Sequence, residues 1–204
     1  MFRLWRNFKI KRRLNHDLML LDQNSLIFDI GANVGEVTRI FSKTNARVIA
    51  FEPHPNAFIK LQKKFKKVEN VVVLNLAAGK VDRFVKLYLH EDTDKSKDDL
   101  SQASSLLLDK PNVSRQCYIN VKEIDLSQYI NSLGLEMDLM KIDIEGYEIE
   151  LINHLIDSGC INKIKKIIVE THEKKFPDLK GPTDKLRERV VQLGLQRKFD
   201  FDWH

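Results

Sequence analysis

The chain has 204 residues, of which 43% are apolar and 31% are charged, and its formal net charge is +5 at pH 7. This balance indicates a folded protein with one sizeable core and excludes an intrinsically disordered chain, and no apolar run approaches the roughly eighteen residues that span a bilayer. The two cysteines, Cys117 and Cys160, do not form a disulfide framework pattern and favour a cytoplasmic setting.

The first residues form a basic segment with interleaved aromatic side chains and no acid. We assign residues 1–22 to a basic amphipathic N-terminal segment and residues 23–204 to the main domain. We interpret the segment as a helix that packs its aromatic face on the domain; the alternatives are a peripheral contact with an anionic membrane or an acidic partner, and nucleic-acid binding. The cationic residues of this segment are Arg3, Arg6, Lys9, Lys11, Arg12 and Arg13. No continuous apolar region follows them, so no secretory signal is expected.

The first expected strand, residues 26–29, leads directly into a glycine turn and then into a helical pattern that reaches about residue 43. Gly31 and Gly35 permit left-handed backbone and the close approach of a ligand. The first amides of the following helix have no partner within it and can receive polar ligand atoms. The Gly-x-x-x-Gly spacing is neither the dinucleotide fingerprint nor a P-loop.

Two further strands are expected at residues 47–51 and 71–74, with a helix between them. Their continuous apolar runs are typical of a parallel sheet that is covered on both faces. Glu52 ends the second strand about twenty residues after the glycine turn, where an acid suits the hydroxyls of a ribose. Asn75 ends the third strand, so that Gly31, Glu52 and Asn75 fall at the carboxyl ends of neighbouring strands.

The middle of the chain is less regular. Residues 84–89 alternate like a strand and are expected to pair with residues 117–124. The long polar stretch between them, residues 90–116, is interpreted as a loop that covers the site, because loops of this length in compact domains are often functional lids. We therefore expect a loop or hairpin insertion around residues 84–124.

Regular elements return after the insertion. Helices are expected at residues 127–133, 147–158 and about 182–193, and strands at 139–142, 164–169 and 197–203. The sequence thus predicts an α/β protein: a Rossmann-like, doubly wound, mostly parallel seven-stranded sheet with helices on both faces.

Four blocks occur in an order that resembles the FkbM family of class I S-adenosylmethionine-dependent methyltransferases. They are Asp29-Ile30-Gly31-Ala32-Asn33-Val34-Gly35, Phe51-Glu52-Pro53-His54-Pro55, Asn75-Leu76-Ala77-Ala78-Gly79 and Lys141-Ile142-Asp143-Ile144-Glu145-Gly146-Tyr147-Glu148. The resemblance extends from about residue 25 to about residue 195. It implies the class I methyltransferase fold, S-adenosyl-L-methionine as the donor and a hydroxyl of a sugar, glycan or small metabolite as the acceptor. Ser104 and Ser105 match a serine pair of the family.

The predicted cofactor-binding residues lie mainly at the ends of the first three strands. Asp29 is expected to place a negative charge near the donor, or alternatively to cap the turn. Glu52 is expected to hold the ribose, and Asn75 either reads the adenine edge or forms a turn. The full set is Asp29, Gly31, Asn33, Gly35, Glu52, Pro53, Asn75, Ala77 and Asp143.

The predicted catalytic residues are Asp143, Glu170 and His172, which follow the fourth and fifth strands of the predicted sheet. A hydroxyl acceptor must lose a proton, and a histidine suits that role at neutral pH. His172 is interpreted as the base or as an orienting residue, and alternation places Glu170 and His172 on the same side of the strand. The predicted substrate-binding residues are Ser104, Ser105, Glu145 and Tyr147. The three catalytic candidates also form a loose ligand set for Mg²⁺, but their spacing does not require a metal and none is predicted.

We therefore predict an FkbM-type O-methyltransferase in which Asp143, His172 or both assist deprotonation. One alternative is a ribose 2′-O methyltransferase acting on RNA, which the lysine clusters suggest, although no RNA-binding module is evident. The other is a non-catalytic protein that keeps the cofactor fold and binds a partner or a membrane surface.

Overall fold

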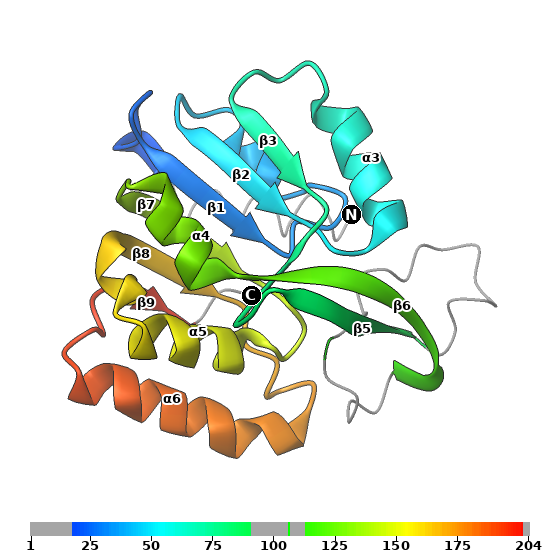
Figure 1. The fold of residues 1–204 in the computed structure, drawn as a ribbon. Helices are drawn as coiled ribbons and strands as arrows, with labels where there is room; N and C mark the ends of the chain where they lie inside the picture. The colour runs from blue at the N-terminus through cyan, green and yellow to red at the C-terminus, as the bar shows by residue number, and fades with distance from the viewer. Residues whose placement is uncertain (1–17, 91–105, 107–112, 202–204) are drawn as a thin grey trace.

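The computed structural model describes residues 18–90, 106 and 113–201, and Figure 1 shows how their elements are arranged. The central sheet has the strand order β3-β2-β1-β7-β8-β9, and each neighbouring pair is parallel. Its strands are β1 (Leu26–Ile30), β2 (Arg47–Phe51), β3 (Val71–Leu74), β7 (Met137–Ile142), β8 (Ile164–Val169) and β9 (Phe199–Asp200). The mostly parallel α/β class is confirmed, with six strands in this sheet in the described part of the chain rather than the predicted seven.

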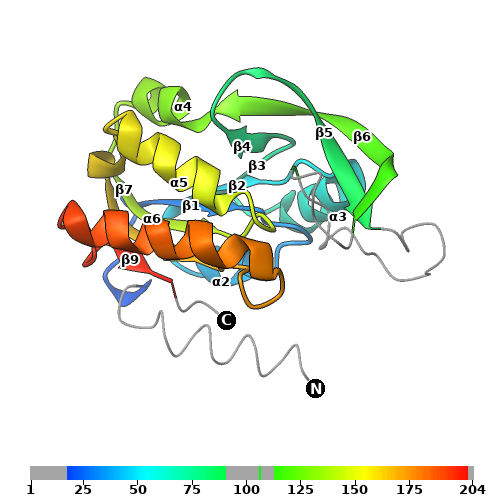
Figure 2. The same cartoon turned by 90° about the horizontal axis from the view of Figure 1, so that it is seen from below.

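Helices cover both faces of the sheet because successive side chains of a strand point to opposite sides. Phe28 and Ile30 belong to the larger core, under α4 (Leu126–Leu133), α5 (Glu148–Asp157) and α6 (Lys180–Gln192). Ile27 faces the opposite side, where it packs with α2 (Thr38–Phe41). On that side α3 (Pro55–Phe65) packs Leu61 and Phe65 against Ala50. Figure 2 shows α5 and α2 on opposite sides of the sheet.

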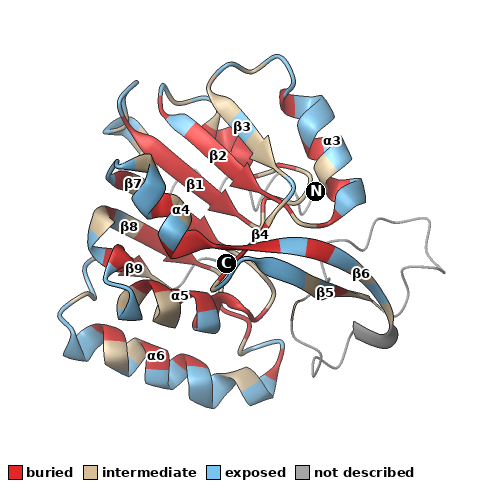
Figure 3. Ribbon diagram, in the orientation of Figure 1, coloured by how far each residue is buried: buried red, intermediate tan, exposed pale blue. Residues whose placement is uncertain are grey.

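The sheet is most deeply buried at its centre, as the colouring of Figure 3 shows. The sequence predicts a buried strand for β3, but this strand lies at the edge of the sheet and the side chain of Val72 is 52% exposed. Two short 3-10 helices are present: η2 (Cys160–Lys163) directly precedes β8, and η3 (Pro177–Leu179) directly precedes α6. The described end of the N-terminal segment, Leu18 and Leu21, packs against the core beside α2. Among the described residues, no helix combines the length and the apolar character needed to cross a membrane.

A second, three-stranded sheet lies beside the first. β5 (Arg83–His90) and β6 (Val113–Asp125) pair antiparallel, as predicted, and β4 (Ala77–Gly79) pairs parallel with β6. Figure 1 shows the β5/β6 hairpin extending away from the central sheet. The base of the hairpin packs through Leu87 and Val121 on Ala77. The predicted contact residues Ser104 and Ser105, and the cationic residues Arg3, Arg6, Lys9, Lys11, Arg12 and Arg13, lie outside the described residues.

Candidate active site

A pocket lies at the carboxyl ends of β1, β2, β7 and β8, where the strand order changes direction between β1 and β7. Ligands of open α/β sheets bind at such a switch point. One side of the pocket is lined by the turns after β1 and β2, including Gly31, Asn33, Glu52 and Pro53. The other side is lined by the acids that follow β7 and β8: Asp143, Glu145 and Glu170. Ala77 and Leu87 of the second sheet, together with Leu106 from the connection between β5 and β6, form a further apolar wall.

The two glycines of the turn are required by packing within the protein. Gly31 has φ +77°, and a Cβ there would lie 1.9 Å from the backbone oxygen of Asp143. Gly35 has φ +76°, and a Cβ there would lie 2.5 Å from Leu61 of α3. Gly31 lines the pocket, whereas Gly35 is absent from its lining. The turn also delays the helix, so that α2 begins at Thr38 instead of the expected Gly35.

Glu52 lies in the pocket wall as the sequence predicts, with only 5% of its side chain exposed. Its Oε2 accepts a hydrogen bond from the backbone N–H of Asn33 at 2.7 Å, and its Oε1 accepts one from that of His54 at 2.8 Å. Burial raises the pKa of Glu52 to about 7, although these two hydrogen bonds oppose the shift. Asn33 has a left-handed backbone, with φ +49°, and its N–H points to Glu52. The turn therefore helps to fix the position of the Glu52 carboxylate.

Asn75 is placed differently from its predicted role at the adenine edge. Its Nδ2 donates to the backbone oxygens of Glu52 at 2.8 Å and Pro53 at 3.0 Å, and the residue is absent from the pocket lining. The structure therefore favours the turn-forming alternative: Asn75 holds the loop that carries Glu52. Ala77, by contrast, does line the pocket.

Asp29 lies below the pocket and does not line it. Its side chain is fully buried, and its Oδ2 accepts a hydrogen bond from Thr38 Oγ1 at 2.6 Å. Its Oδ1 lies 3.2 Å from Nζ of Lys141, the residue opposite it in the β1–β7 register. The side chain of Asp29 thus contacts other residues of the protein and does not line the cavity. This position does not favour the predicted direct contact with the cofactor, which stays a prediction.

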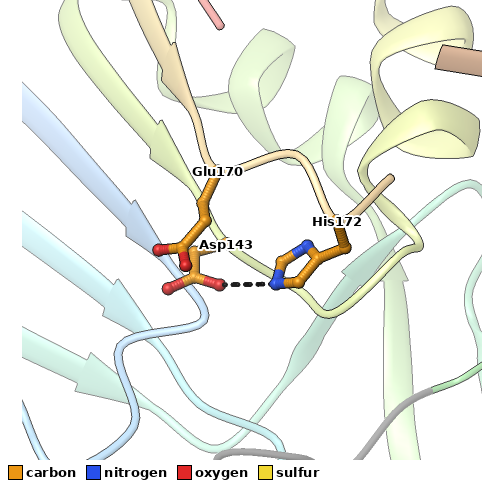
Figure 4. A group of neighbouring side chains, drawn as sticks. All are labelled: Asp143, Glu170 and His172. Carbon is orange, nitrogen blue, oxygen red and sulfur yellow. Dashed lines mark ion pairs between the residues drawn. The ribbon is translucent and has the colours of Figure 1, made fainter. Parts of the chain in front are cut away.

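The three catalytic candidates, Asp143, Glu170 and His172, come together at the acidic end of the pocket (Figure 4). Each offers one ligand-type atom, and these atoms all lie within 4.8 Å of one another. His172 Nε2 lies 3.7 Å from Asp143 Oδ1. Asp143 and Glu170 line the cavity, but His172 is only 5% exposed and lies behind them. β8 ends at Val169, so Glu170 and His172 both lie in the segment that follows the strand, with their side chains in the same cluster.

His172 is held from behind by a buried acid. Its Nδ1 lies 3.0 Å from Oε1 of Glu148, whose Oε2 accepts a hydrogen bond from the backbone N–H of Gly146 at 2.7 Å. Burial alone would lower the pKa of His172, but the bond to Glu148 and the carboxylates of Glu145 and Asp143 raise it overall. The arrangement therefore favours the charged imidazolium beside Asp143.

The two described substrate-contact candidates lie on different sides of the turn after β7. Glu145 has φ +55° and lines the pocket. Its Oε1 lies 3.8 Å from Nε2 of His172, and its Oε2 lies 3.3 Å from Nζ of Lys175. Tyr147 turns away from the cavity: its hydroxyl donates to Oε1 of Glu123 at 2.9 Å. Burial, together with the charge of Glu123, raises the pKa of Tyr147 above its ordinary value. The predicted acceptor contact of Tyr147 is thus not favoured by its position.

Sequence reasoning assigned no site role to Lys141, Glu148 or Glu123. Lys141 lines the pocket and bridges Asp29 and Asp143, and Glu148 fixes His172. Glu123 is fully buried and joins Tyr147 to Arg83, whose Nε lies 2.7 Å from its Oε2. A signal existed for Lys141 and Glu148: a charged residue inside a mostly apolar strand, or at the start of an apolar helix, needs a buried partner. Glu123 lies in the mostly polar strand β6 and had no such signal.

The open α/β sheet, with an acid-lined pocket at its switch point, defines the fold class as Rossmann-like. The family model described as "Methyltransferase FkbM domain" matches residues 29–197, so the chain belongs to the FkbM methyltransferase family. The predicted family is therefore confirmed. A crystal structure of methyltransferase FkbM from Methylobacillus flagellatus shares the fold with a TM-score of 0.51 and 15% identity; the alignment covers 86% of this chain and 38% of that one.

Two curated relatives are similar in sequence. Hexuronic acid methyltransferase AglP of Haloferax volcanii is 24% identical over 154 residues, which cover 74% of this chain and 57% of AglP. AMB antimetabolite synthetase AmbE of Pseudomonas aeruginosa is 23% identical over 216 residues, which cover 89% of this chain and 10% of AmbE. The chain therefore spans about a tenth of one relative and little more than half of the other.

Proposed function

We propose that this protein is an S-adenosylmethionine-dependent O-methyltransferase whose acceptor is a hydroxyl of a sugar, glycan or small metabolite. One observation carries the proposal: a single pocket brings Glu52 and the glycine turn of β1 opposite Asp143 and Glu170. The name of AglP, a hexuronic acid methyltransferase, supports a sugar acceptor.

The residues of the pocket fit the donor. Glu52 is a carboxylate at the end of β2, and a carboxylate accepts both hydrogen bonds of a ribose diol. Apolar residues of the lining, Val34, Phe51 and Ala78, suit an adenine ring and a thioether. Asn75 contributes by holding the backbone of Glu52 and Pro53 in place.

S-adenosylmethionine, when bound, supplies a methyl group on a sulfonium, and an in-line displacement moves this group to the acceptor. The protein then has two tasks, to align the acceptor and to take its proton. We assign the second task to Asp143, an assignment supported by its position in the pocket lining with Glu170 beside it. His172 lies behind Asp143, 3.7 Å from its Oδ1, so we assign it the orienting role, with Glu148 fixing the ring. Asp143 would take the proton of the acceptor hydroxyl as its oxygen bonds to the methyl carbon and the methyl–sulfur bond breaks, and S-adenosylhomocysteine would be the leaving group.

Donor binding is tested first, because it needs no knowledge of the acceptor. Calorimetry with S-adenosylhomocysteine is carried out on the full chain, on Glu52→Ala and on the matched control Glu69→Ala, with NAD as a second ligand. We expect micromolar binding that is lost only in Glu52→Ala. No binding to the folded wild type, alone or with glycan or RNA added, would overturn the proposal.

Acceptor class is tested next, by mass spectrometry of methyl transfer to glucuronic acid glycosides, neutral sugars and RNA. The acidic end of the pocket disfavours phosphate, since three carboxylates line it. We expect transfer to a sugar hydroxyl. Transfer only to RNA, with a rate that falls steeply as salt rises, would identify the ribose 2′-O alternative instead. Tight donor binding without transfer to any acceptor would favour a non-catalytic protein.

A further inference from the structure

Lys141 is a lysine at the floor of the pocket with only 2% of its side chain exposed. It lies in β7, a strand that is otherwise almost wholly apolar and buried. Lysine is rarely buried this completely without a partner, because removing an ammonium from water is costly. The contacts of Lys141 therefore show what the charge is used for.

Four oxygens surround its Nζ. The ammonium donates to the backbone oxygen of Gly31 at 2.7 Å and lies 3.3 Å from that of Ile30. It also lies 3.2 Å from Asp29 Oδ1 and 3.5 Å from Asp143 Oδ2. Burial would lower the pKa of Lys141, but the carboxylates of Asp29, Asp143 and Glu170 raise it overall, so the amine stays charged.

Asp29 and Asp143 have different relations to this ammonium. Asp29 is fully buried and fixed by Thr38, so it neutralises Lys141 from below. Asp143 lines the cavity and has one oxygen toward each of two cations: Oδ2 faces Lys141 at 3.5 Å, and Oδ1 faces His172 Nε2 at 3.7 Å. The carboxylate is thus clamped between a lysine of β7 and a histidine that follows β8.

The glycine turn does not depend on Lys141 alone. The N–H groups of Gly31 and Ala32 both donate to the backbone oxygen of Phe51, at 3.1 and 2.9 Å. The N–H of Asp143 donates to the backbone oxygen of Ile30 at 3.1 Å. These backbone bonds hold the donor side of the pocket independently of the ammonium.

We propose that Lys141 is a positioning residue for methyl transfer, which holds the Asp143 carboxylate toward the acceptor end of the pocket. The expected effect on the rate of methyl transfer rests on the proposed function. The expected effect on the orientation of Asp143 does not depend on it. Lys141 acts on the reaction through Asp143. Asp29 is the buried carboxylate that offsets the cost of burying the charged ammonium of Lys141.

The test uses the double variant Lys141→Met with Asp29→Asn. Lys141→Met alone would leave Asp29 as an uncompensated buried charge and is expected to unfold the protein. The double variant removes both charges of the pair and keeps the net charge constant, while the amide oxygen introduced by Asp29→Asn still accepts from Thr38. Asp29→Asn alone is the reference, and Lys165→Met is the matched control, because Lys165 is an exposed lysine of the same sheet paired with Asp138.

We expect the double variant to bind S-adenosylhomocysteine with a Kd within about threefold of that of Asp29→Asn. Its single-turnover rate of methyl transfer to the sugar acceptor should be about 10–100-fold lower than that of Asp29→Asn, because a misplaced reacting group lowers the rate by that order. Lys165→Met should match the wild type. Equal rates for the double variant and Asp29→Asn would overturn the proposal, because Lys141 would then serve only to neutralise Asp29.

A crystal structure of the double variant decides the same point without an acceptor. We expect the Asp143 carboxylate to leave the position in which Oδ1 faces His172. An unchanged carboxylate would overturn the proposal. If wild-type protein transfers no methyl group at all, the proposed function fails, and this structural comparison still tests the role of Lys141.

Discussion

Glu148 and His172 form a buried pair in which Oε1 of the acid lies 3.0 Å from Nδ1 of the ring. The acid is the first residue of α5, and the histidine lies three residues beyond the end of β8, so the pair joins the turns that follow two adjacent strands. Since Glu148 engages Nδ1, the other nitrogen of the ring is directed to Asp143. The pair therefore determines which atom of His172 the pocket carboxylates meet.

The first prediction concerns the stability that this pair contributes. The folded state raises the pKa of His172 above its ordinary 6.5, so the contribution is fully present below about pH 6.5 and is lost as pH rises through the raised value. His172→Gln should therefore lower the free energy of unfolding by about 1–3 kcal/mol at pH 6 and by less at pH 9. Urea unfolding at both pH values measures this, with Glu150→Gln, an exposed residue of α5, as control. An equal loss at both pH values would mean that folding does not raise the pKa of His172, and a larger loss at pH 9 would mean that folding lowers it.

A second prediction concerns Glu52, whose pKa is about 7 in the folded protein. The carboxyl is ionised above that pH, and only the ionised form accepts both hydrogen bonds of a ribose diol. The affinity for S-adenosylhomocysteine should therefore fall by roughly tenfold when pH drops from 8 to 6. In Glu52→Gln the affinity should be weaker and nearly constant over this range. Calorimetry at three pH values measures both, and a flat profile for the wild type would contradict the assignment of Glu52.

The third prediction separates two kinds of glycine. Gly31→Ala places a Cβ 1.9 Å from the backbone oxygen of Asp143, which cannot yield without moving the turn after β7. We expect a loss of more than about 3 kcal/mol in unfolding free energy, as for other severe overpacking. Gly159→Ala is the matched control, since it has φ +71° but no atom within 4 Å of the added Cβ, and it should cost only about 1 kcal/mol. Similar losses for both variants would show that backbone conformation, not contact with Asp143, makes Gly31 necessary.

A fourth prediction concerns metal ions. Asp143, Glu170 and His172 offer ligand atoms within 4.8 Å of one another, but the Lys141 ammonium already lies 3.5 Å from Asp143 and supplies positive charge there. We therefore expect methyl transfer to change by less than about twofold after dialysis against EDTA, a change that corresponds to well under 1 kcal/mol. Loss of activity with EDTA and its recovery with Mg²⁺ or Mn²⁺ would show that these three residues are metal ligands.

The fifth prediction concerns Tyr147, which the sequence suggested as an acceptor contact. Its hydroxyl is bound to Glu123, so Tyr147→Phe leaves a buried carboxylate with one partner fewer. We expect a loss of about 1–3 kcal/mol in stability and an unchanged KM for the acceptor. Thermal unfolding and steady-state kinetics on the same preparation separate the two effects. A raised KM with normal stability would restore the predicted substrate contact.

The strands of the central sheet could be predicted from the sequence because their apolar runs are continuous. The strands predicted at residues 47–51, 71–74 and 164–169 are β2, β3 and β8 with the same bounds. The short β4 was not predicted, because Ala77–Gly79 has small residues and becomes a strand only by pairing with β6. Its partner residues, which begin at Glu123, lie far along the chain, beyond the reach of any local pattern.

The candidate site was predicted in its location but not in the direction of each side chain. Glu52, Asp143 and Glu170 line the pocket, as strand ends of a parallel sheet imply. Asp29, Asn75 and His172 instead bind other parts of the protein, because their directions depend on Lys141, on the β2 loop and on Glu148. Those partners become neighbours only in the folded chain. A charged residue in an apolar strand, such as Lys141, is the sequence feature that best indicates such a buried partner.

The attachment of the hairpin has a consequence for which of its residues can be exchanged. Glu123 of β6 joins the hairpin to the rest of the domain through Tyr147 and the backbone N–H of Lys80, and it pairs with Arg83 of β5 within the hairpin. Phe84 of β5 is 77% exposed. Because the contacts of Glu123 lie at one end of the hairpin, substitutions away from that end leave the attachment to Tyr147 and Lys80 intact. The hairpin is therefore attached to the domain as a unit: exchanging exposed residues of its described strands, such as Phe84, while Arg83 and Glu123 are kept, should leave the central sheet unchanged.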